Sequence, residues 1–123
     1  MVRVGVSVAD VRELALTLPR TTEHLIRDRV KFRVKSIVYC AFSRDERLMG
    51  FGFPKDERDA LVAAEPEVYL LPGESDLRFH WVVARMDRLD LATMEERVVD
   101  AWSMCVPKFL QREVAERRRW GAS

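Results

Sequence analysis

Five basic residues occupy alternate positions of segment 27–35, and this spacing suits the binding of anions. On an extended strand a period of two places all five on one face, over roughly 26 Å at 3.3 Å per residue. Like charges in such a row repel one another, and phosphates along a nucleic-acid backbone would relieve that repulsion. The alternative is a solvated strand face with acidic neighbours on the next strand. The five residues are Arg27, Arg29, Lys31, Arg33 and Lys35.

The formal net charge of +1 conceals an uneven distribution of charge along the chain. Segment 27–35 has five basic residues against one acidic residue, and segment 107–119 has five against two. Residues 36–106, by contrast, have eight basic and fourteen acidic residues. We therefore expect a second basic patch around Lys108 and Arg112, although basic chain ends often do no more than solvate a helix.

The residue types that most often carry catalysis or bind metals show no recognisable pattern here. The two histidines, His24 and His80, and the two cysteines, Cys40 and Cys105, lack metal-ligand spacing. The G-x-G at 50–52 has no phosphate-binding lysine after it. Adjacent acidic pairs on a helix point about 100° apart and cannot share a proton. We expect a protein that is not an enzyme and that holds neither a metal nor a cofactor.

The cysteines and the apolar runs also bear on where the protein works. Two cysteines in apolar surroundings indicate buried thiols in a reducing compartment. The first residues reach Asp10 too early for a signal peptide, and no apolar run is long enough to span a membrane. We expect a cytoplasmic protein with no membrane partner.

A hairpin is expected to carry the basic run. Strands over 30–34 and 36–42 leave only a residue or two around Lys35 for the turn. The apolar residues of the first strand alternate with the cations and need the core, so the cations must face outward. These apolar residues are Val30, Phe32 and Val34.

Helices and further strands are expected on either side of this hairpin. A helix over 8–18 begins with a capping box formed by Ser7 and Asp10. In the strand over 47–53, two glycines suggest a bulge or the close approach of another backbone. The remaining expected elements are a helix from Pro54 to about Ala64, strands over 67–71 and 78–86, a helix from near Leu91 with Thr93 as N-cap, a break at Pro107, and helical turns to about Arg119.

This order of elements is typical of an α+β two-layer sandwich, with helices packed on one face of an antiparallel sheet. A chain of 123 residues fits one domain, covering 1–123. Phe32, Trp81 and Trp102 are expected in its core because they repeat with the apolar residues.

Several segments together resemble the MmcQ/YjbR family of small bacterial proteins. They are VRELALTLPRTTEH, KFRV, PKDERDALVAAEPEVYLLPG and HWVVARMDRLDLATMEERVVDAWSMCVPKFL, and the resemblance covers about residues 8–110. It implies a frataxin-like fold and DNA binding by hairpins arranged as wings. The sequence departs from the pattern at LIRDRV, where members commonly have an aromatic-glycine-proline stretch, and at GFGF, where many have a lysine.

The basic strand and the resemblance together predict a nucleic-acid-binding module that contacts DNA phosphates with little sequence specificity. The expected contacts are the five cations of segment 27–35 together with Lys108 and Arg112, and the hairpin tip at 44–47 is expected to serve as a wing. The alternative is a protein-interaction or small-ligand module whose basic face meets an acidic partner.

Overall fold

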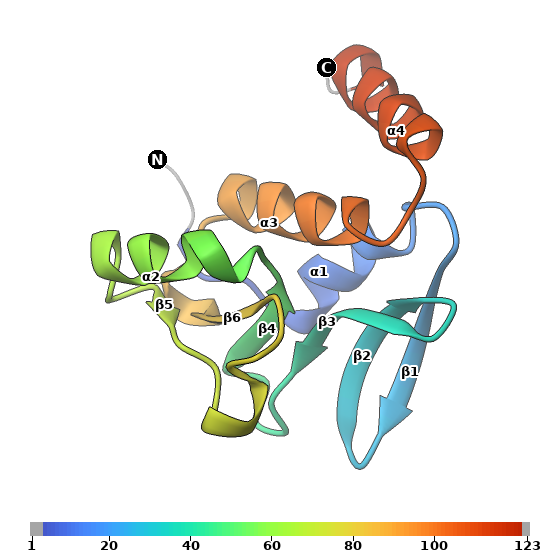
Figure 1. Cartoon of the computed structure of the whole chain (residues 1–123). Helices are drawn as coiled ribbons and strands as arrows, with labels where there is room; N and C mark the ends of the chain where they lie inside the picture. The colour runs from blue at the N-terminus through green and yellow to red at the C-terminus, as the bar shows by residue number, and fades with distance from the viewer. Residues whose placement is uncertain (1–3, 122–123) are drawn as a thin grey trace.

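The computed structural model describes residues 4–121 of the chain. Within these residues four α-helices pack against an antiparallel sheet of six strands, which is the expected α+β sandwich of two layers (Figure 1). The helices are α1 (Val8–Ala15), α2 (Lys55–Ala64), α3 (Leu91–Ser103) and α4 (Lys108–Gly121). The strands are β1 (Thr21–Ile26), β2 (Arg29–Val34), β3 (Ile37–Phe42), β4 (Leu48–Gly52), β5 (Tyr69–Leu70) and β6 (Trp81–Arg85). Among the described residues, no helix is both long and apolar enough to cross a membrane.

The sheet follows the chain for four strands and then reverses its last two, in the order β1-β2-β3-β4-β6-β5. The expected hairpin of β2 and β3 is confirmed, with Lys35 and Ser36 between the strands. The sequence did not predict β1, which pairs along its whole length with β2. Four of its six side chains are exposed, as suits an edge strand, so its apolar pattern is weak.

The ends of the helices follow from local hydrogen bonds. The capping box of α1 is confirmed, because the Ser7 hydroxyl accepts from Asp10 N at 3.2 Å and the Asp10 carboxylate accepts from Ser7 N at 2.9 Å. The expected N-cap of α3 at Thr93 is wrong. Asp90 is the cap instead, and its carboxylate accepts from Thr93 N at 2.7 Å.

The core lies between the sheet and the helices. Phe32 and Trp102 are fully buried, as expected, and the Trp102 indole Nε1 donates to the Pro19 carbonyl at 2.8 Å. Trp81 is only half-buried, so its expected place in the core is wrong. Its neighbour Val82 fills the core, and the alternation of a strand then turns Trp81 to the opposite side of the sheet.

Candidate functional site

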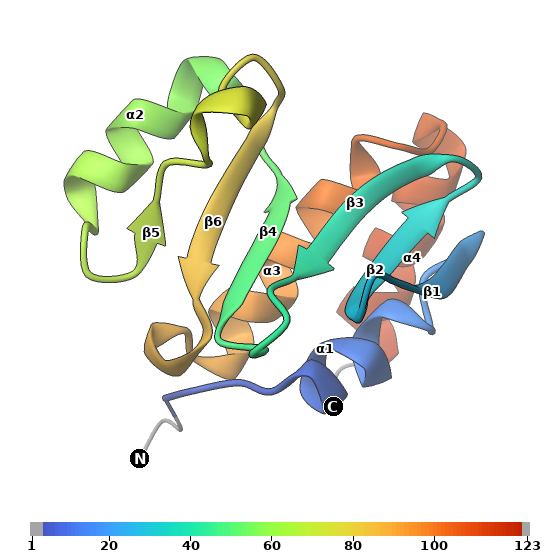
Figure 2. The ribbon, with the colours of Figure 1, turned by 90° about the horizontal axis from the view of Figure 1, so that it is seen from below.

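One face of the sheet carries no helix, and we call it the open face. Figure 2 shows it towards the viewer, with α1, α3 and α4 behind the strands. Val30, Phe32 and Val34 of β2 are buried against the helices. Because successive side chains of a strand point to opposite faces, Arg29, Lys31 and Arg33 lie on the open face. The outward direction predicted for these three cations is therefore confirmed.

The neighbouring strands offer these cations no acidic partner. Across the sheet, β1 places Ile26, His24 and Thr22 opposite Arg29, Lys31 and Arg33 in turn. On the other side, β3 places Ala41 beside Lys31 and Val38 beside Arg33.

The one acidic residue of β1 is engaged elsewhere. Glu23 pairs across the strands with Phe32, and its carboxylate accepts from Arg12 Nε of α1 at 2.9 and 3.1 Å. Within residues 4–121, none of Arg29, Lys31 and Arg33 forms a side-chain hydrogen bond or salt bridge. The acidic neighbours that the alternative expected on the next strand are therefore absent opposite these cations.

The two outer cations of the basic run do not belong to the strand. Arg27 and Asp28 form the turn between β1 and β2, with φ of 54° and 64°. Lys35, with φ of 55°, lies in the next turn. The expectation that five cations share one extended face is wrong, because tight hairpin turns of this kind require positive φ and interrupt the alternation.

The second basic patch lies on a different side of the molecule. Lys108 and Arg112 are exposed on α4, which stands behind the sheet when the open face is in view (Figure 2). The apolar side of that helix, with Leu110 and Val114, is buried. The structure therefore divides the seven expected contact residues into three on the open face, two in its flanking turns, and two on the helix side.

A groove opens in the sheet next to the β2 cations. Strands β3 and β4 pair only from Cys40 to Phe42 and from Met49 to Phe51. The first half of β3 and Gly52 at the end of β4 have no such pairing, and Figure 2 shows these two strands diverging with α3 behind the gap. The hollow has a volume of about 520 Å³, which is the size of a typical small-ligand pocket.

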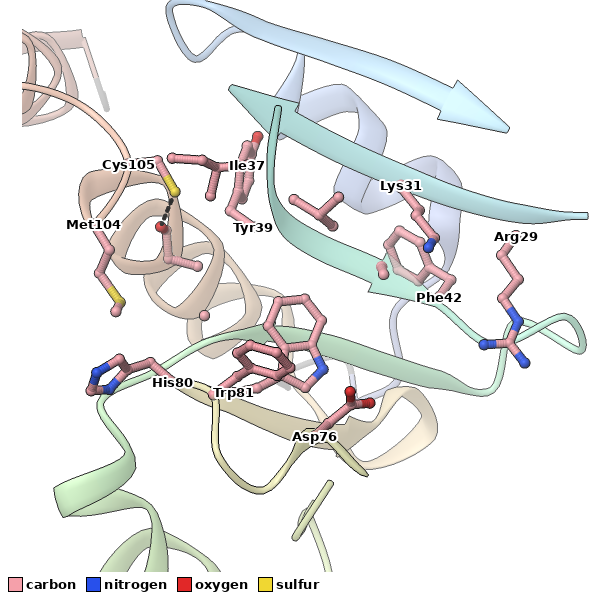
Figure 3. Close-up of a pocket in the computed structure, with 15 residues that line it drawn as sticks. Arg29, Lys31, Ile37, Tyr39, Phe42, Asp76, His80, Trp81, Met104 and Cys105 are labelled. Atoms are coloured by element: carbon pink, nitrogen blue, oxygen red, sulfur yellow. Dashed lines mark hydrogen bonds between the residues drawn. The ribbon is translucent and has the colours of Figure 1, made fainter. Parts of the chain in front are cut away.

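The two walls of this groove differ in chemistry. Arg29 and Lys31 of β2 line one side, and Ile37 adds an apolar edge (Figure 3). Opposite them lie Asp76, His80 and Trp81, from the segment leading into β6 and from its first residue (Figure 3). Phe79, from the same segment, also lines the groove. At the end of α3 the groove is lined by Ala101, Met104 and Cys105.

Gly50 determines how Trp81 lies in the groove. A Cβ atom on Gly50 would stand 2.6 Å from the indole Nε1 and 2.8 Å from two of its ring carbons. The indole can therefore rest on the backbone of β4 only because residue 50 has no side chain. The sequence indicated a close approach here, and the group that approaches is a tryptophan ring.

A buried arginine holds the segment that carries Phe79, His80 and Trp81. Arg58 of α2 donates from Nη1 to the carbonyls of Phe79 and Trp81, both at 3.0 Å, and from Nη2 to that of Leu77 at 2.9 Å. These bonds draw the segment towards α2, and β6 begins at Trp81 rather than at residue 78 as expected. Sequence reasoning missed this role, because nothing local marks an arginine that bonds to carbonyls some twenty residues later in the chain.

Hydrogen bonding and burial determine the state of the histidine and the two cysteines in and near the groove. His80 accepts from Lys55 N through Nδ1 at 3.0 Å, so the neutral ring carries its hydrogen on Nε2. Burial raises the pKa of the Cys40 thiol, and partial burial raises that of the Cys105 thiol. Both thiols are free. Among the described residues, no three His, Cys, Asp or Glu side chains group closely enough to hold a metal ion.

Comparison with known proteins places this architecture in a family. The chain is similar over 89% of its length to the crystal structure of a Deinococcus radiodurans protein with a DUF419 domain, of which it covers 88%. The TM-score is 0.72 and the identity is 18%, so this likeness shows a shared fold. No curated protein matches the sequence. The family model described as YjbR matches residues 16–104, which is most of the chain, and the protein therefore belongs to the YjbR family.

Proposed function

We propose that this protein binds nucleic acid through the open face of its sheet, with Arg29, Lys31 and Arg33 contacting phosphates. The observation that carries this proposal is the set of three unpaired cations on a face without helices, where β1 and β3 place no acidic residue beside them. Side chains two residues apart on a strand are separated by roughly 6.6 Å. That spacing is comparable with the distance between successive phosphates of a nucleic-acid strand.

The expected binding is electrostatic and has little sequence specificity. Contacts to phosphates position a protein on nucleic acid without reading the bases, and the release of counterions supplies much of the free energy of binding. The turns at each end of β2 add Arg27 and Lys35 near the same strand. Arg44 Nε donates to the Arg27 carbonyl at 3.2 Å, so the hairpin tip proposed as a wing lies against the turn between β1 and β2.

The role proposed here is binding and not catalysis. An acidic protein partner is the second candidate, since the same cations would attract carboxylates. Carboxylates on a folded protein are not arranged at a regular phosphate-like spacing, and nucleic acid therefore suits this strand better.

The test is a titration of fluorescein-labelled DNA and RNA with wild-type protein and with the variant Arg29→Gln/Lys31→Gln/Arg33→Gln, at two or more salt concentrations. The fold should survive, because Arg29 is exposed and the half-buried Lys31 and Arg33 form no side-chain hydrogen bond or salt bridge within residues 4–121. If each cation neutralises one phosphate, the slope of log K against log salt for duplex DNA should be about 2.7 less negative for the variant than for the wild type.

A control variant removes two charges from the other side of the molecule. Lys108→Gln/Arg112→Gln lowers the net charge without touching the open face. This control should retain most of the wild-type salt dependence. Absence of any binding to DNA or RNA at low salt, or equal binding by the triple variant, would refute the proposal.

A further inference from the structure

We infer that the groove between β3 and β4 receives an unpaired base of a single-stranded nucleic acid, stacked on Trp81, while the β2 cations hold the adjoining phosphates. The inference rests on the proposed function and names its substrate class. It starts from a different observation, which is the half-buried tryptophan beside a hollow of about 520 Å³.

Trp81 is fixed in a way that suits stacking. Its ring lies on the Gly50 backbone, and its strand pairs with β4 through Gly52. Arg58 holds its carbonyl. An aromatic ring fixed in this way loses little conformational freedom when a base stacks on it, and its face accepts any of the four bases. Phe79, half of whose surface is exposed, adds a second aromatic ring to the same wall.

The charges across the groove match the two ends of a nucleotide. Arg29 and Lys31 line the side that would meet a phosphate. Asp76 and His80 lie with Trp81 on the opposite side, where the carboxylate can accept from an N–H group of a base, such as N3–H of thymine, and the imidazole Nε2 can donate. The carboxylate of Asp76 would repel a phosphate, so the polarity of the groove favours one orientation of the ligand.

The dimensions agree with this orientation. Two strand spacings separate β2 from β4, on which the indole rests, and this gives roughly 10 Å between the cations and the stacking ring. That distance is comparable with the length of a nucleotide from its phosphate to the far edge of its base. In a duplex each base is paired and stacked, and it would have to leave the helix to enter the groove at a cost of a few kcal/mol. Single strands avoid this cost.

The experiment compares a labelled dT oligonucleotide with a labelled duplex of the same length, using wild-type protein and Trp81→Ala. We expect Trp81→Ala to bind the single strand about tenfold to a hundredfold more weakly, since stacking one base contributes about that much. Its affinity for the duplex should be unchanged. Trp81→Phe keeps an aromatic face and should recover most of the affinity. Trp120→Ala removes an exposed tryptophan on α4, with 79% of its surface accessible, and should behave as wild type.

A second measurement does not depend on the variant Trp81→Ala. Single-stranded dT should quench the tryptophan emission of the wild-type protein, and Trp81→Phe should lose this quenching. Unchanged single-strand affinity in Trp81→Ala, or equal quenching in Trp81→Phe, would overturn the stacking inference while leaving the proposed function standing. Binding of free thymidine monophosphate as tightly as the oligonucleotide would also overturn it, because the β2 cations would then hold no further phosphates. Absence of binding to every nucleic acid would refute both the stacking inference and the proposed function.

Discussion

The two glycines of β4 allow a direct test of the contact that positions Trp81. They lie two residues apart on the same strand, and each would direct an added side chain at a different neighbour. A methyl group on Gly50 would lie 2.6 Å from Trp81 Nε1, about 1 Å inside the usual separation of non-bonded atoms. On Gly52 the same methyl group would lie 3.6 Å from Ala101 Cβ and 3.7 Å from Met104 Sδ, at ordinary contact. Alanine should therefore destabilise the protein at position 50 but not at position 52.

Gly50→Ala should lower the free energy of unfolding by about 1–3 kcal/mol, the usual cost of one extra methyl group in a packed site. For a domain of this size that corresponds to a fall in Tm of about 4–12 °C. Gly52→Ala should leave stability unchanged or raise it by about 0.4–1 kcal/mol, because alanine restricts the unfolded chain more than glycine does. Urea denaturation and thermal melts followed by circular dichroism measure both quantities.

A double-mutant cycle identifies the cause of the Gly50→Ala effect. If the indole is the obstacle, Gly50→Ala should cost little in a Trp81→Ala background, because the ring that it would strike is absent. An equal loss of stability with and without Trp81 would refute the proposed packing. So would a loss at Gly52→Ala as large as that at Gly50→Ala.

Two further substitutions test the packing behind the open face. Trp102→Ala should cost about 3–5 kcal/mol, because the side chain is fully buried and its Nε1 bonds to the Pro19 carbonyl; an unchanged Tm would show that α3 is not packed as described. Arg58→Met should cost about 2–4 kcal/mol in urea denaturation, because three carbonyls lose a charged donor. Arg58→Lys should recover only part of this loss, since an ammonium group lacks the planar fork that spans several acceptors, and full recovery by lysine would contradict that account.

The sequence alone determined the features that depend on neighbours along the chain. The capping box of α1 needs only Ser7 and Asp10, three residues apart. Alternation in β2 needs only its own apolar residues, so the outward direction of Arg29 could be predicted without knowing which strands lie beside it. These patterns also support the family resemblance, which the YjbR match confirms.

Prediction from the sequence failed at turns, at the N-cap of α3 and at the edge strand, where the local pattern of residues is ambiguous or weak. Arg27 and Lys35 continue the spacing of the basic run, but both lie in tight turns with positive φ, which their residue types do not favour. Thr93 and Asp90 are both able to cap α3, and only the observed hydrogen bond distinguishes them. The edge strand β1 has too few buried residues to show an apolar pattern.

The tertiary structure alone decided the composition of the candidate site. The separation of β3 from β4, the placement of Trp81 over Gly50 and the attachment of residues 77–81 to Arg58 all join residues far apart in the chain. The same holds for the basic patch on α4, which the fold places behind the sheet, away from the β2 cations. A sequence fixes the direction of a side chain within its own strand or helix, whereas strand order, register and the packing of helices determine which side chains meet.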